Sequence, residues 1–228
     1  MDIWADCRDA VVPVALEGEL IRFVESQEKI ATNALVDNLD EQWLLEEMLE
    51  ASKPPAVAEA ARLHYLLTTP FRYPPLKHGS RFGSRFEPSL FYGSRDQDAA
   101  LAETAYYRFV FWSGMTTAPP SGKLTTEHTA FGACFAVGKG LRLQAEPFAA
   151  CRERLIDPGD YADTQLLGRN MREAGIEAFE YLSARDPAQG INVALFHAGA
   201  FSGHQPLWQE AWLCQTRAQG VSFYNKSV

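Results

Sequence analysis

An arginine in a glycine-rich loop is the first feature of this chain that could do chemistry. Arg81 lies between Gly79 and Gly83, with Ser80 and Phe82 beside it. A planar guanidinium can bind a phosphate through two parallel hydrogen bonds, and flanking glycines let the backbone approach a ligand closely. The loop is also basic in a chain that is otherwise acidic, which suits an anionic ligand. The alternatives are that Arg81 is a surface side chain or that the nearby Arg85 is the functional arginine.

A carboxylate follows in an unusually apolar setting. Glu103 stands in the run Ala-Leu-Ala-Glu-Thr-Ala-Tyr-Tyr. A partly buried carboxylate is costly unless it is paired or hydrogen-bonded, so it usually has a purpose. Such an anion can stabilise positive charge that develops on a substrate. The alternative is a structural ion pair with an arginine such as Arg108.

Two aromatic residues and a downstream serine complete the set. Phe91 and Tyr92 end a short apolar strand, and strand alternation lets only one of them face a pocket. Tyr92 could stack on a planar ring and offer its hydroxyl. Ser183 ends a predicted strand without a nucleophile elbow, so it is not an activated nucleophile, and a turn-forming serine is the alternative. Arg185 could contact a phosphate or pair with Glu103.

Arginine, glutamate and serine in this order, in these settings, resemble the RES domain family. The resemblance runs from about residue 71 to residue 196. In the family the arginine motif is Gly-Gly-Arg-aromatic, and here Ser80 replaces the second glycine. The resemblance implies an α+β fold with an ADP-ribosyltransferase-like core. It also implies that Arg81, Glu103 and Ser183 serve catalysis, and that Arg81, Tyr92, Phe91 and Arg185 bind NAD.

The resemblance implies a function as well. Family members are NAD-consuming toxins of bacterial toxin–antitoxin pairs, so NAD is a consumed substrate and no cofactor is expected. The nicotinamide–ribose bond would break, with water or inorganic phosphate as acceptor. The expected partner is a helix-turn-helix-type antitoxin, and toxin subunits often pair as homodimers. A protein ADP-ribosyltransferase and a non-catalytic binding module remain alternatives.

Composition sets broad limits on these readings. The chain has 228 residues, 46% of them hydrophobic, and a net charge of −8. An acidic surface argues against direct nucleic-acid binding, which needs a basic face. No apolar run reaches the roughly 20 residues of a membrane helix, and the first residues do not form a signal peptide. We therefore expect a cytoplasmic protein whose four cysteines stay reduced. Its five histidines form no metal-ligand spacing, so no metal is expected.

The elements that must position these residues divide the chain in two. Residues 1–69 are predicted to be a mostly helical region packed on the core, because apolar residues recur there at three-to-four spacing. Residues 70–228 would form the NAD-binding catalytic domain. In it we expect a strand at 90–92, a helix from Asp96 to 107, a hairpin over 131–144 that turns at 138–140, and a helix over 161–173, on which Gln165 is exposed. Further strands are predicted at 177–181, 191–196, 207–215 and 221–224.

Overall fold

The computed structural model describes residues 2–26, 36–55 and 62–226, and it is built around one mixed seven-stranded sheet. The strands are β1 (Val14–Glu25), β2 (Phe91–Ser94), β3 (Leu124–Arg142), β4 (Ala178–Leu182), β5 (Ile191–Leu195), β6 (Trp208–Arg217) and β7 (Gly220–Asn225). Their order is β1-β2-β5-β4-β3-β6-β7, with an additional pairing of β1 with β3. That pairing closes five strands into a ring, and β6 and β7 extend the sheet from the other edge of β3.

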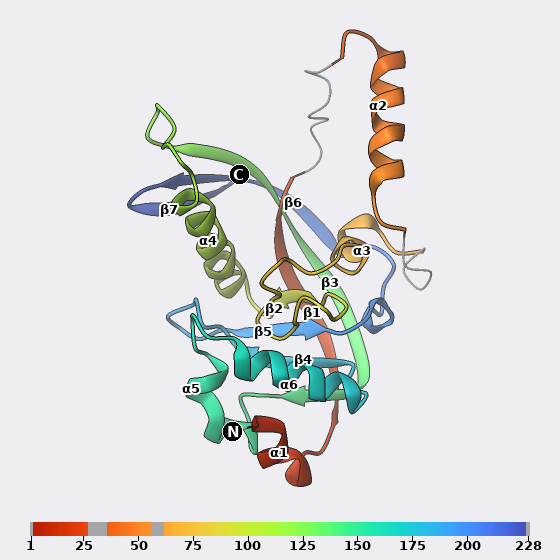
Figure 1. The fold of residues 1–228 in the computed structure, drawn as a ribbon, viewed down its shortest axis with the longest axis vertical. Coiled ribbons are helices and arrows are strands. Elements are labelled where there is room, and N and C mark those ends of the chain that lie inside the picture. Colours follow the sequence, from red (N-terminus) through yellow and green to blue (C-terminus); the bar gives the residue numbers. More distant parts are fainter. Residues whose placement is uncertain (1, 27–35, 56–61, 227–228) are drawn as a thin grey trace.

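Helices surround this sheet (Figure 1). They are α1 (Ile3–Cys7), α2 (Leu39–Ser52), α3 (Tyr65–Arg72), α4 (Gln97–Ser113), α5 (Arg152–Leu155) and α6 (Ala162–Glu173). Short 3-10 turns are η1 (Arg8–Ala10), η4 (Phe148–Cys151) and η5 (Ala198–Ala200). Helix α4 contacts β1 and β7, α6 packs near α1 and α5, and α2 extends away from the sheet (Figure 1).

The predicted α+β fold class is confirmed, and two buried clusters explain how the layers hold together. One lies between α1, α6 and the β4–β5 part of the sheet, around Phe82, Leu167 and Phe179. The other lies inside the strand ring, around Leu20 and Phe131. Burial of such apolar surface contributes roughly 25 cal/mol per Å², which makes it the main stabilising force of the fold.

The helical prediction for residues 14–25 is wrong, because this segment is the strand β1. Its buried residues are Leu16, Leu20 and Phe23, at the spacing of a helix face. In the structure Leu16 and Leu20 belong to one core cluster and Phe23 to another, so both faces of the strand are covered. Because buried residues occur on both faces of β1, they do not alternate strictly with exposed ones, and their spacing resembles that of a helix. The division of the chain at residue 69 stays a prediction, although β1 joins the N-terminal region to the main sheet.

The rest of the N-terminal prediction has mixed results. The helix expected to begin at Asp40 as N-cap is confirmed by α2, but its N-cap is Asn38, whose side chain accepts from the Glu41 amide. The apolar positions Ile30, Ala31 and Leu35 lie outside the described residues, as does the start of the helix expected at residue 56.

The hairpin predicted over 131–144 is also wrong. Gly138-Lys139-Gly140 makes no turn, and β3 continues through it from Leu124 to Arg142. The glycine at 140 serves close packing, since a side chain there would collide with Leu16 of β1. The strand prediction at 90–92 and the four later ones are confirmed by β2, β4, β5, β6 and β7, and the two helix predictions by α4 and α6.

Candidate functional site

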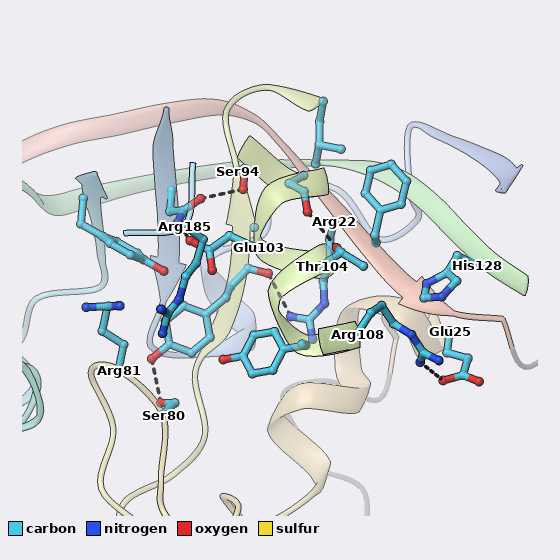
Figure 2. Close-up of a pocket in the computed structure, with 18 of the residues that line it drawn as sticks. Arg22, Glu25, Ser80, Arg81, Ser94, Glu103, Thr104, Arg108, His128 and Arg185 are labelled. Carbon is cyan, nitrogen blue, oxygen red and sulfur yellow. Dashed lines mark hydrogen bonds and ion pairs between the residues drawn. The ribbon is translucent and has the colours of Figure 1, made fainter. Parts of the chain in front are cut away.

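A cavity of about 450 Å³ lies between β1, α4, the loop that carries Arg81, and the ends of β4 and β5. This volume is typical of small-molecule sites. Arg81, Tyr92, Glu103 and Arg185 all line it, although they come from four separate segments of the chain. Figure 2 shows Arg81 and Arg185 on one side, Glu103 in the middle, and Arg108, Glu25 and His128 on the other side.

Arg81 is held at the edge of the cavity by uncharged groups. Its Nη1 donates to the carbonyl oxygens of Leu155 and Asp157, at 3.2 and 2.8 Å. The guanidinium also lies over the ring of Tyr161, 4.7 Å from the centroid. Among the described residues no carboxylate forms an ion pair with it. Its charge is therefore available to an anion, while the guanidinium is held in place through Nη1.

The loop around Arg81 is rigidly supported rather than flexible. The Tyr92 hydroxyl accepts from the amide of Phe82 at 3.2 Å and shares a 2.8 Å hydrogen bond with Ser80 Oγ. Burial raises the pKa of Tyr92 to about 12, so the hydroxyl keeps its proton at physiological pH. Tyr92 thus both lines the cavity and holds the loop.

Helix α6 supports the same loop from the other side. Gln165, predicted to be exposed, is only partly exposed and donates to the carbonyl of Ser80 at 2.9 Å. Thr164 donates to the carbonyl of Arg81 at 2.5 Å. A side chain at Gly168 would collide with the Phe82 carbonyl, so this glycine permits the close approach of helix and loop. The backbone of the loop is consequently fixed at three successive residues.

Glu103 is anchored through one oxygen. Oε1 accepts from Ser183 Oγ and from Asn192 Nδ2, each at 2.7 Å. Ser94 in turn donates to Asn192 Oδ1 at 2.7 Å and fixes the orientation of that amide. Within the described part of the chain Oε2 has no hydrogen bond and Glu103 has no ion pair, which differs from the structural alternative of a pair with Arg108. One carboxylate oxygen is positioned and the other is available.

Ser183 acts behind Glu103 rather than in the cavity. It is 1% exposed and does not line the pocket. Its hydroxyl donates to Glu103 and accepts from the backbone amides of Arg185 and Asp186, at 3.1 and 3.0 Å. Since both hydrogen-bonding functions are used, Ser183 orients the carboxylate and the turn that carries Arg185.

Arg185 does not pair with Glu103. Its Nη2 donates to the carbonyl of Pro158 at 2.6 Å and to the hydroxyl of Tyr161 at 2.8 Å. Its guanidinium lies 3.4 Å from the centroid of the Tyr106 ring. Arg81 and Arg185 therefore share Tyr161 and the segment 155–158 as their support.

The structure shows which member of two open alternatives lines the cavity. Phe91 is fully buried and stacks with Phe71 of α3, so of the two aromatic residues Tyr92 is the one that lines the cavity. Arg85 is exposed and lies over Phe86, away from the cavity, whereas Arg81 lines it.

Sequence analysis missed several residues that share the cavity. Arg22 comes from β1, Asn192 from β5, and Arg108 and Phe111 from the last turns of α4. None stands in a motif, because strand pairing alone brings β1 and β5 to α4. Only the apolar character of α4 around Glu103 could have indicated that its later turns also line a pocket. Within the described residues no group of three or more His, Cys, Asp or Glu side chains could hold a metal ion.

Comparison with known proteins now adds to this geometry. The family model described as RES domain matches residues 56–216. The chain belongs to the RES domain family. Membership agrees with the resemblance carried by Arg81, Glu103 and Ser183. No curated relative matches the chain.

A solved structure supports the fold of this RES domain protein. It is a chain in the crystal structure of the M. tuberculosis MbcT–MbcA toxin–antitoxin complex, similar with a TM-score of 0.55 and 10% sequence identity. The similarity covers 92% of this chain and 91% of that one. The ADP-ribosyltransferase-like core expected from the sequence is borne out by this likeness. The RES match begins at residue 56, so β1 and its pocket residues lie outside it.

Proposed function

We propose that this RES domain protein consumes NAD by breaking the bond between nicotinamide and ribose. The bonding electrons leave with nicotinamide, which departs as a neutral molecule. The ribose carbon becomes a short-lived cation and accepts an oxygen of water or inorganic phosphate, and the acceptor loses one proton to solvent. NAD is thus a substrate and is not regenerated.

Glu103 carries this proposal. A carboxylate stabilises an oxocarbenium-like transition state when it is held in place before the reaction, because no reorganisation is then needed as charge develops. Glu103 meets this requirement, since Ser183 and Asn192 anchor Oε1 and leave Oε2 for the substrate. No cation of the described residues neutralises it, so its charge remains available to the sugar.

The surrounding groups fit a dinucleotide. Arg81 and Arg185 present positive charge and form no ion pair among the described residues, which suits a phosphate of the substrate. Tyr92 lines the same cavity and carries a protonated hydroxyl and an aromatic ring. Removal of NAD would explain toxicity without any contact to nucleic acid.

We further propose that the protein is the toxin of a toxin–antitoxin pair in the cytoplasm. The structural neighbour belongs to a complex of this kind. None of the described helices is long and apolar enough to span a membrane. The expected partner is a helix-turn-helix-type antitoxin that blocks the pocket, and a homodimer of the toxin is the expected assembly.

A product assay tests the proposed reaction. The purified protein is incubated with NAD, with and without inorganic phosphate, and products are followed by mass spectrometry. We expect nicotinamide release that falls by about 100- to 1,000-fold in Glu103→Gln, as for loss of one preorganised electrostatic group. Arg81→Ala should raise KM for NAD. A dependence of the product on phosphate would identify the acceptor.

The matched control is Glu173→Gln, the same change at an exposed position near the end of α6. It should leave nicotinamide release unchanged. Wild-type activity retained by Glu103→Gln would contradict the proposed mechanism. Label from NAD that appears on a protein would instead indicate an ADP-ribosyltransferase, and intact NAD under every condition would indicate a binding module.

A further inference from the structure

The cavity does not end at Glu103. Helix α4 continues along it for two more turns, about 12 Å of helix at 1.5 Å per residue. These turns carry Arg108 and Phe111, and they face Arg22 and Glu25 of β1 and His128 of β3 (Figure 2). We call this part the Arg108 end, formed by Arg22, Glu25, Arg108, Phe111 and His128. The part formed by Arg81, Tyr92, Glu103 and Arg185 is called the Glu103 end.

Arg22 brings an unneutralised charge to the boundary of the two ends. Its Nη1 donates to the carbonyl of Tyr92 at 3.0 Å, and its guanidinium lies 4.6 Å from the centroid of the Phe91 ring. Among the described residues no carboxylate pairs with it. Burial lowers the pKa of Arg22 to about 10, so it remains charged at neutral pH. A partly buried cation without a counterion is costly to the fold, and a bound anion would offset that cost.

Arg108 and His128 have hydrogen-bonding capacity that the protein leaves unused. Arg108 Nη1 donates to Glu25 Oε2 at 3.1 Å, but its buried Nε has no partner among the described residues. His128 shares a 3.0 Å hydrogen bond with Thr126 through Nε2, while its buried Nδ1 has no partner there either. Both residues are more than nine-tenths buried, at 7% and 3% exposed. A buried polar group without a partner is costly to the free protein, and both of these residues line one end of the cavity, which points to a ligand there.

The two ends differ in which half of NAD they suit. The nicotinamide ring of NAD is positively charged, and Arg22 and Arg108 would repel it. Adenosine monophosphate offers the opposite chemistry, with an anionic phosphate and a neutral purine rich in acceptors and donors. Phe111 adds an aromatic ring beside the Arg108 guanidinium, 5.1 Å from it. At the Glu103 end, by comparison, the Glu103 carboxylate has no ion pair among the described residues and would attract the charged ring.

We propose that the Arg108 end is the subsite for the adenylate half of the dinucleotide, a nucleoside monophosphate. Arg22 and Arg108 bind its phosphate, and His128 and Phe111 bind its base. This assignment rests on the proposed consumption of NAD. It orients the substrate with its adenylate half at the Arg108 end and its nicotinamide half at the Glu103 end. Arg22 and Glu25 lie on β1, which precedes the matched residues 56–216.

Truncated substrates provide the first test. Nicotinamide mononucleotide contains the cleaved bond but lacks the adenylate half. We expect Arg108→Met to raise KM for NAD at least tenfold, the loss of one charge-assisted hydrogen bond, and to change kcat/KM for nicotinamide mononucleotide less than threefold. Equal losses with both substrates, or no loss with either, would overturn the assignment. Arg217→Met, at the exposed arginine that ends β6, is the matched control and should change neither.

Glu25→Gln gives a prediction of opposite sign. Glu25 competes with a phosphate for Arg108, and its neutralisation leaves the buried Arg108 guanidinium without an ion pair among the described residues, which a bound anion would restore. This variant should bind AMP at least threefold more tightly. Weaker binding would show that the Arg108–Glu25 ion pair only supports the fold and does not compete with a ligand, and the proposal would fail.

A binding experiment separates this subsite from the cleavage reaction. AMP, adenosine and inorganic phosphate are titrated separately into wild type, Arg108→Met and Arg217→Met by calorimetry. We expect AMP to bind wild type at least tenfold more tightly than Arg108→Met. That result supports the subsite even if NAD stays intact, whereas NAD cleavage with AMP binding independent of Arg108 overturns the subsite alone.

The titrations with inorganic phosphate and adenosine show whether the site binds a nucleotide or free phosphate. Inorganic phosphate that binds as tightly as AMP would mark a free-phosphate site and overturn the adenylate assignment. Should Arg108→Met fail to fold, Arg108→Lys takes its place, because lysine keeps the charge and loses the planar fork. It should bind AMP several-fold more weakly with an unchanged Tm, and equal affinity would contradict the proposal.

Discussion

The two ends of the cavity differ in how far the protein satisfies its own polar groups. At the Glu103 end, Ser183 and Asn192 hold the carboxylate, Tyr92 holds the arginine loop, and backbone carbonyls hold Arg81. At the Arg108 end, Arg108 Nε and His128 Nδ1 lack partners among the described residues.

This difference indicates that one end acts on the transition state and the other end only binds the ligand. Groups that must act on a transition state benefit from being fixed in advance, because reorganisation during the reaction would raise the barrier. Groups that only bind can keep unused donors for the ligand, at some cost to the stability of the free protein. The Glu103 end matches the first kind and the Arg108 end the second.

Ser183→Ala should have the largest effect of these three changes, because it releases the Glu103 carboxylate from its fixed position. It removes a hydrogen bond to a charged group and leaves the amides of Arg185 and Asp186 without their acceptor. We expect kcat for NAD cleavage to fall about 10- to 100-fold with little change in KM. Steady-state kinetics checks this, Ser183→Thr should restore part of the rate, and Ser222→Ala on β7 is the exposed control. A rise in KM alone would contradict a positioning role.

Tyr92→Phe should loosen the arginine loop with a smaller effect. The change leaves the Phe82 amide without its acceptor and Ser80 without its partner, which costs roughly 1–3 kcal/mol. We expect a Tm several degrees lower, measured by calorimetry, and a raised KM for NAD. Because the pKa of Tyr92 is about 12, these effects should be the same from pH 7 to pH 9. Tyr224→Phe, at an exposed position of β7, should leave Tm unchanged.

The smallest expected effect concerns pH at the Arg108 end. Burial, followed by the nearby charge of Arg108, lowers the pKa of His128, while Glu25 acts in the opposite direction. The folded protein then binds fewer protons than the unfolded chain, whose histidine titrates near pH 6.5, so stability rises with pH. We expect the free energy of unfolding to decrease from pH 7 to pH 5 by more in wild type than in His128→Asn. Urea unfolding at both pH values measures this, and equal slopes would contradict a buried neutral histidine.

Sequence reasoning reached the Glu103 end because its residues stand in local patterns. Arg81 lies among glycines, and Glu103 lies in an apolar helix whose N-cap, Asp96, is itself legible from the sequence. The spacing of Leu16, Leu20 and Phe23 was misleading, since a strand buried on both faces can imitate a helix. Glycines at 138 and 140 imitated a turn, although one of them serves strand packing.

The Arg108 end could not be predicted in the same way. Arg22 reaches the cavity only because β1 pairs with β3 over its whole length, a contact between residues more than a hundred positions apart. At the Glu103 end, Asn192 depends in the same way on the pairing of β5 with β2, where it lies opposite Ser94. Pairings of that range leave no signal in local composition.

The place of β1 also bears on how this protein can be shortened. Residues 56–216 cover the family match, yet they omit the strand that pairs with residues 128–140 of β3 and closes the ring. A chain cut to that range would present the bare edge of a long apolar strand, and such edges recruit strands from other molecules. The part of the sequence that marks the family is therefore expected to aggregate on its own.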